Sequence, residues 1–96
     1  TYPWPYANRA SCYFEQMRWQ EAFEDYSHLM QLVEITANER YKRGYAAYRL
    51  EKWDEALHDL QYALDNTDAI EEDLEWFLHV QLLVTEINTL RANAVD

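Results

Sequence analysis

The sequence predicts an all-α domain of antiparallel helical hairpins, with about five helices in a single unit spanning residues 1–96. Three observations predict this fold. Apolar residues make up 49% of the chain and recur at helical spacing along most of it. The chain has one glycine and two prolines, and both prolines precede residue 6, so no later proline interrupts a helix. Finally, the sequence resembles itself at an offset of 34 residues, which is typical of a repeated helical unit.

The offset divides the chain into a first repeat at about residues 3–36, a second at about 37–70 and a closing helix at about 69–92. Five positions are identical between the two repeats and two more are closely similar. The matched pairs are Arg9/Arg43, Trp19/Trp53, Glu21/Glu55, Ala22/Ala56, Asp25/Asp59, Phe14/Tyr48 and Arg18/Lys52.

The apolar spacing predicts two helices in each repeat, at residues 5–16 and 19–33 and then at 37–50 and 53–65. The breaks fall near residues 16–18 and 51–52. Thr36 followed by Glu39 forms a capping box, which favours a helix start at residue 37.

The closing helix is expected at residues 69–92, where Asp68 and Glu71 form a second capping box. An acidic run at Glu71, Glu72, Asp73 and Glu75 suits the positive end of the helix dipole. We interpret one apolar stripe, Ile70, Leu74, Phe77 and Leu78, as packing on the repeat core.

A second stripe on the closing helix has heptad spacing and is expected to point away from the repeat core. Its members are Trp76, Val80, Leu83, Ile87 and Leu90. A capping helix needs only one apolar face, so this stripe predicts a homodimer formed through the last helix. The alternative is a broad face buried under Tyr2, Trp4 and Tyr6.

The small residues at the helix crossings make the chain similar to tetratricopeptide repeats. Ala10 and Gly44 hold the small site of the first helix, and Ala22 and Ala56 hold that of the second. Tyr13 takes the aromatic site of this family, while Tyr26 and Leu60 take its large apolar site. The resemblance implies a right-handed array of two hairpins with a capping helix, serving as a protein-binding module. The chain departs from the family at Met17 and Glu51, where glycine is usual, and at Glu34 and Asp68, where proline is usual.

The segment Tyr6–Ala10 resembles a motif of chaperone-binding repeats, whose asparagine contacts the terminal carboxylate of a peptide. In that subfamily a lysine and an arginine one repeat later complete the clamp. Here Asn8 is kept, but those two places hold Asn38 and Lys42. The charge-assisted hydrogen bonding of such a clamp is therefore reduced.

The first helices of the two repeats are expected to line a peptide-binding groove that is aromatic and partly basic. The expected residues are Trp4, Asn8, Ser11, Phe14, Glu15, Tyr41, Lys42, Tyr45, Tyr48 and Arg49. Lys42 and Arg49 would anchor an acidic group. The alternative is that the aromatic residues only pack between helices.

The formal charge of −10 argues against nucleic acid and anionic membranes as partners, because both attract clusters of lysine and arginine. No apolar run is long enough to span a membrane. One cysteine excludes an internal disulfide, so a natural chain is expected in the cytoplasm. We interpret the basic residues near the third helix as a solvated face that complements the acidic closing helix; they are Arg40, Lys42, Arg43, Arg49 and Lys52.

The sequence offers no catalytic residues, metal ligands or cofactor motif. Glu55 and His58 have the spacing of a di-iron ligand pair, and Asp25 and His28 have the same spacing. The second pair lies at a different position of its repeat, so the two pairs would not converge on one metal site. We interpret these four as exposed helix residues, and Cys12 as a buried packing thiol.

The resulting hypothesis is a protein-protein interaction module without enzymatic activity, which binds a protein or peptide partner. A second hypothesis is a designed or redesigned scaffold with no biological partner. The high aromatic content and the absence of glycine and proline from the turns favour it. A third is a helical element whose only role is dimerisation.

Overall fold

The structure of the chain, a computed structural model, describes residues 3–66 and 74–94. These residues form five α-helices and no strand, which confirms the all-α class and the helical-hairpin arrangement. The helices are α1 (Trp4–Glu15), α2 (Trp19–Leu32), α3 (Ala37–Arg49), α4 (Trp53–Asp65) and α5 (Leu74–Ala94). The predicted ends of the first four helices agree within one residue. The expected start of the closing helix and its Asp68–Glu71 capping box lie outside the described residues.

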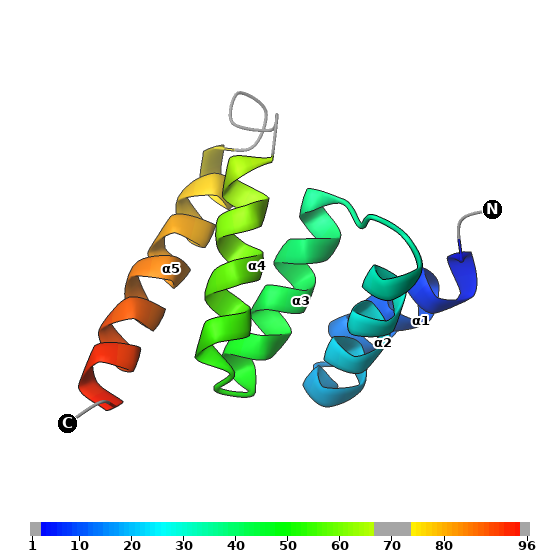
Figure 1. Ribbon diagram of the computed structural model, residues 1–96, viewed down its shortest axis with the longest axis horizontal. Coiled ribbons are helices and arrows are strands. Elements are labelled where there is room, and N and C mark those ends of the chain that lie inside the picture. Colours follow the sequence, from blue (N-terminus) through cyan, green and yellow to red (C-terminus); the bar gives the residue numbers. More distant parts are fainter. Residues whose placement is uncertain (1–2, 67–73, 95–96) are drawn as a thin grey trace.

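The helices follow one another along the longest dimension of the molecule (Figure 1), which measures 44 Å by 32 Å by 23 Å. Each helix packs on the one before it and the one after it, so α1 and α5 lie at opposite ends. The helices at the ends of this array therefore have faces that no other helix of the described chain covers.

Local sequence explains where the helices begin. Pro5 lies in the first turn of α1, where its missing N–H costs no intrahelical bond. The expected capping box before α3 is confirmed: the Glu39 amide donates to the Thr36 hydroxyl at 3.1 Å, and the Thr36 amide donates to the Glu39 carboxylate at 2.9 Å. The turns within the two hairpins both use a left-handed residue, with φ of 61° at Met17 and at Glu51. Tetratricopeptide repeats, which the chain resembles, usually have glycine at these positions.

The four small sites are all fully buried, as the repeat pattern predicts. Ala10, Ala22 and Ala56 have no exposed surface. Gly44 is buried as well, and a Cβ atom there would lie 3.0 Å from the Asp59 Cβ and 3.0 Å from the Leu60 Cγ. A side chain at this crossing would therefore meet side-chain atoms of α4 in tight contact.

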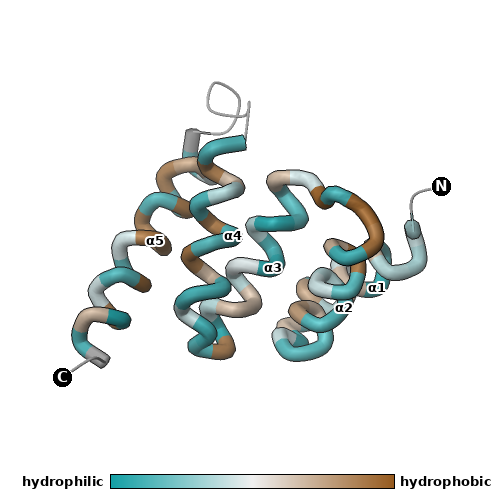
Figure 2. The backbone as a smooth tube through the Cα atoms, in the orientation of Figure 1, coloured by the Kyte–Doolittle hydropathy of each residue, from teal (hydrophilic) through white to brown (hydrophobic). Residues whose placement is uncertain are grey.

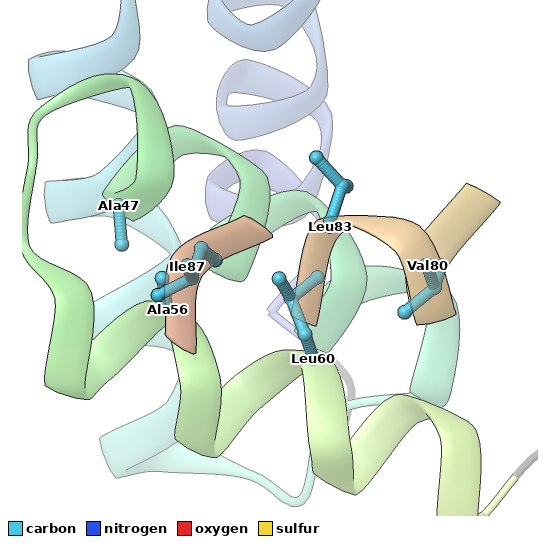
Figure 3. Packing of buried hydrophobic residues seen from close by; sticks show 6 residues of the cluster. All are labelled: Ala47, Ala56, Leu60, Val80, Leu83 and Ile87. Atoms are coloured by element: carbon cyan, nitrogen blue, oxygen red, sulfur yellow. The ribbon is translucent and has the colours of Figure 1, made fainter. Parts of the chain in front are cut away.

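The buried apolar residues form two clusters, one in each half of the array. Figure 2 shows hydrophobic and hydrophilic stretches alternating along the helices, and a hydrophobic stretch where α2 connects to α3. Ile35 of that connection is buried with Tyr26 and Leu29 in the first cluster. The second cluster joins α3, α4 and α5 (Figure 3) and consists of Ala47, Ala56, Leu60, Val80, Leu83 and Ile87.

The second cluster corrects the expected orientation of α5. Val80, Leu83 and Ile87 were expected to point away from the repeat core, but they are buried against α4. Trp76 is half-buried beside them, and only Leu90 of that stripe is exposed. The proposed dimer face is therefore the internal packing face of this helix. Leu78, which was assigned to the core, is instead 48% exposed.

Ion pairs correct a second expectation. Asp25 and Asp59 are buried, and each accepts from the arginine 16 residues before it. Arg9 Nε lies 2.7 Å from Asp25, and Arg43 Nη1 lies 2.6 Å from Asp59, which also binds Arg40 at 3.0 Å. Arg40 and Arg43 thus belong to a packed network between α3 and α4 and not to a solvated face. Asp25 is not the exposed residue that its D-x-x-H spacing suggested.

Cys12 is exposed, although the sequence favoured a buried packing thiol. The cause is the position of α1 at the end of the array. Its buried residues, Ala7 and Ala10, face α2, and no further helix of the described chain covers the opposite side. An apolar environment predicted from sequence neighbours such as Tyr13 does not form there.

Candidate peptide-binding surface

A continuous series of aromatic rings crosses the molecule from α1 to α5. We call it the aromatic row, and its members are Phe14, Trp19, Tyr41, Tyr45, Tyr48, Trp53, Trp76 and His79. Neighbouring ring centroids lie 5.4–6.5 Å apart along it, for example 5.5 Å between Trp19 and Tyr45 and 5.4 Å between Tyr41 and Trp76. Most of these pairs are tilted or edge-on, the arrangements that aromatic quadrupoles favour.

Helical spacing places the centre of the aromatic row on one face of α3. Tyr41, Tyr45 and Tyr48 are four and three residues apart, so they lie above one another on the helix surface. Tyr45 is the central member, because its ring contacts Phe14 of α1, Trp19 of α2 and His79 of α5. One helix thus aligns aromatic side chains from all of its neighbours.

The tyrosines of the aromatic row are half-buried, so they pack between helices and also keep part of their surface exposed. Burial raises the pKa of the Tyr41 phenol, because the charged phenolate loses hydration there. The Tyr48 hydroxyl donates to the Glu86 carboxylate at 2.6 Å. This hydrogen bond is the main reason that the pKa of Tyr48 is also raised.

A pocket of about 470 Å³ lies between α1 and α3, next to the aromatic row. It brings together Asn8, Ser11 and Lys42, which the sequence assigned to the groove, with Asn38, which takes a place of the resembling clamp. Its remaining lining consists of Trp4, Ala7, Tyr26, Thr36 and Glu39. The pocket therefore offers two amides, hydroxyls, one ammonium group and the Glu39 carboxylate, which accepts from the Thr36 amide at 2.9 Å.

The two cations of the predicted groove each lie close to a ring of the aromatic row. Lys42 Nζ donates to the Ser11 hydroxyl at 3.2 Å and lies 5.7 Å from the centre of the Phe14 ring. The exposed Arg49 guanidinium lies 5.6 Å from the centre of the Trp19 ring. Contact with an aromatic face holds a cation without neutralising it, so both groups keep their charge for an anionic ligand.

Of the ten residues expected to line the groove, four are in the aromatic row and four, Trp4, Asn8, Ser11 and Lys42, line the pocket beside it. Arg49 lies over the Trp19 ring, and Glu15 is exposed on α1. Sequence reasoning missed four members, namely Trp19, Trp53, Trp76 and His79. The 34-residue identity of Trp19 and Trp53 was a signal that could have found two of them. Trp76 had been assigned to the dimer face, yet its ring meets Tyr41.

Other chemistry has little basis in the part of the chain that the structure describes. Among residues 3–66 and 74–94, no three histidine, cysteine, aspartate or glutamate side chains are grouped so that they could hold a metal ion. Glu55 and His58 are exposed on α4, as their spacing suggested. None of the helices in these residues combines the length and the apolar character needed to cross a membrane.

Comparison with known proteins adds no relative: no protein-family model matches the chain, and neither the curated proteins nor the solved structures contain a match.

Proposed function

We propose that this chain is a protein-interaction module that binds a peptide segment along the aromatic row. The observation that carries the proposal is the row itself, in which half-buried rings from α1, α2, α3, α4 and α5 lie at contact distance. Rings held by one another lose little conformational freedom when a ligand binds, so they form a preorganised apolar platform. The resemblance to tetratricopeptide repeats, which are binding modules, supports the same function.

The polar groups beside the aromatic row suggest the chemistry of the peptide. Proline and aromatic side chains of an extended segment would pack on the exposed parts of the tyrosine rings. An acidic side chain or terminal carboxylate would accept hydrogen bonds from Lys42 and from the amides of Asn8 and Asn38 in the pocket between α1 and α3. Because one ammonium group replaces the two cations of a full clamp, this end of the site contributes less affinity than the rings.

The experiment is a selection from a library of displayed peptides, followed by affinity measurements with the best binder. Tyr45→Ala and Lys42→Glu are expected to weaken binding, by about tenfold for the lost ring contact. Two matched controls lie outside the site. Tyr13→Ala removes a half-buried tyrosine that packs with Arg18, and Arg91→Glu makes the same change of charge at the far end of α5.

Circular dichroism of each variant separates loss of binding from loss of folding. If Tyr45→Ala and Lys42→Glu remain folded and bind as tightly as the parent, the assignment of the groove is wrong. If the library yields only peptides whose affinity depends on Tyr13 or Arg91, the binding surface lies elsewhere.

A further inference from the structure

A second groove lies between α4 and α5, outside the aromatic row. It has a volume of about 590 Å³ and is lined by Gln61, Leu64, Leu78, Gln81, Leu82, Val84 and Thr85. None of these residues is charged, although charged residues make up 27% of the chain. Leu78 is 48% exposed and Leu82 is 70% exposed. Two large exposed leucines in an uncharged groove are typical of a binding surface.

The internal repeat of the fold indicates what shape of ligand fits this groove. In α3, Arg43 lies between the two neighbouring helices: its Nε donates to Ser27 of α2 at 2.9 Å, and its Nη1 donates to Asp59 of α4 at 2.6 Å. The next residue, Gly44, faces the following helix α4. In α5, Val80 is buried against the preceding helix α4, and the next residue, Gln81, lines the open groove. Leu78 of the groove follows Gly44 by 34 residues, which is the repeat offset, so the groove borders the face of α5 that corresponds to the face of α3 covered by the antiparallel helix α4.

The charges at the two ends of the groove indicate the direction of such a ligand. Where α4 ends and α5 begins, Asp65 and Glu75 are exposed. Glu75 precedes Leu78 by three residues and Leu82 by seven, so it lies on the same face of α5. At the other end, Arg91 is paired with Asp54 at 2.7 Å. A helix antiparallel to α5 would place its last turn beside these two acidic side chains, of which Asp65 accepts from Gln61 at 3.0 Å, and cationic side chains in that turn also suit the helix dipole.

We propose that the groove between α4 and α5 binds an amphipathic helix of a partner protein, antiparallel to α5, with basic residues in its last turn. The apolar stripe of this helix covers Leu78 and Leu82, and its basic residues lie beside Asp65 and Glu75. Because the net charge of the chain is −10, a positively charged partner is favoured over a second copy of the chain. This proposal is independent of peptide binding along the aromatic row.

The probe is a fluorescein-labelled 18-residue peptide of leucine, alanine and glutamine, with leucine at helical spacing and two lysines in the last turn. A second peptide carries the two lysines in the first turn instead. Fluorescence anisotropy is expected to show saturable binding of the first peptide to the intact chain. Leu82→Gln should weaken it about tenfold. Glu75→Gln should weaken the first peptide about threefold, and the second peptide less.

Two controls locate the effect. Leu32→Gln changes a leucine of similar exposure, 53%, on α2 and should leave affinity unchanged. Tyr45→Ala should also leave it unchanged, because the aromatic row is a separate site. Leu82 is 70% exposed, so its replacement leaves the packed core intact, and circular dichroism verifies this.

Three results would overturn the proposal. One is that neither peptide binds the parent chain saturably. Another is that Leu82→Gln binds the first peptide as tightly as the parent does, or that Leu32→Gln weakens it equally. The third comes from analytical ultracentrifugation: a mass that rises with concentration and is reduced to the monomer by Leu82→Gln would make a second copy the occupant.

Discussion

Replacing Met17 or Glu51 with glycine should stabilise the protein, because both residues hold a left-handed backbone with φ of 61°. They occupy the same place in the two hairpin turns, 34 residues apart. The turn hydrogen bonds use only backbone atoms: the Met17 amide donates to the Phe14 carbonyl at 3.0 Å, and the Glu51 amide donates to the Tyr48 carbonyl at 3.1 Å. Glycine keeps both bonds and removes the clash of Cβ with the backbone.

The size of the effect follows from two opposing terms. A non-glycine residue in the left-handed region costs about 1–2 kcal/mol. Glycine loses roughly 0.5–1 kcal/mol of this gain, because it has more freedom in the unfolded chain. The side chains contribute little, since Met17 is 71% exposed and Glu51 is also exposed. We therefore expect a net stabilisation of about 0.5–1 kcal/mol for each change.

Urea unfolding followed by circular dichroism measures this gain. The two turns share no side-chain partner, so the double variant should show the sum of the single effects. Each kcal/mol raises the Tm of a domain of this size by about 4–8 °C. Glu24→Gly is the matched control, because it places glycine at an exposed site inside α2, where it should destabilise by about 1 kcal/mol. If Met17→Gly and Glu51→Gly gain no more than the corresponding alanine variants, backbone strain at the turns is not the cause.

Three further predictions concern packing and titration. Gly44→Ala should destabilise by about 1–3 kcal/mol in urea unfolding, since its Cβ would lie 3.0 Å from side-chain atoms of α4; a neutral result would refute the close crossing. Asp59→Asn should lower the free energy of unfolding by about 3 kcal/mol, because two packed arginines lose their anion. Asp54→Asn, in the exposed pair with Arg91, should change it by less than about 0.5 kcal/mol. Because the pKa of Tyr48 is raised in the folded protein, the unfolded chain releases this proton at lower pH, and the free energy of unfolding should fall as pH rises above about 10. Glu86→Gln removes the hydrogen bond that raises this pKa, so it should lower the midpoint of the tyrosinate absorbance titration. An unchanged midpoint would contradict the role of that hydrogen bond.

The hairpins could be predicted from the sequence because two independent signals agree on them. Apolar spacing places the helices, and the 34-residue offset places small residues at both crossings. Ala10 and Gly44 are buried in the structure, and a Cβ at Gly44 would lie 3.0 Å from side-chain atoms of α4, which is the tight packing that the pattern implies. The capping box at Thr36 adds a third signal, and it fixed the start of α3 to the residue.

The orientation of α5 could not be predicted in the same way. Periodicity gives the angle between two apolar stripes on one helix, but it does not say which stripe meets the neighbouring helix. Heptad spacing suits packing within a chain as well as between chains. Here α4 presents Ala56 and Leu60 to α5: Ile87 lies beside Ala56 (Figure 3), and Val80 and Leu83 belong to the same buried cluster. The assignment depends on the partner surface, which the spacing of α5 alone does not contain.

The buried aspartates show a second limit. Asp25 was interpreted as an exposed helix residue, because charged residues on helices usually are, and Asp59 was noted only as its match in the second repeat. Their partners lie 16 residues earlier, on the preceding helix, so no pattern within one helix links them. The signal that was present is that both members of each pair, Arg9 with Asp25 and Arg43 with Asp59, match across the 34-residue offset. Two charges of opposite sign that recur together are better explained by a contact between them than by solvation.

This pairing also determines how the groove attracts a ligand. Of the basic residues on α3, Arg40 and Arg43 are both paired with Asp59, and their side chains are only 14% and 12% exposed, so they present little positive charge at the surface. The attraction for an acidic peptide therefore depends on Lys42, which reaches a neutral hydroxyl, and on Arg49 beside Trp19. In a chain of net charge −10, two such cations act only over short distances. Binding should therefore depend more on ring contacts than on charge, and added salt should weaken it only slightly.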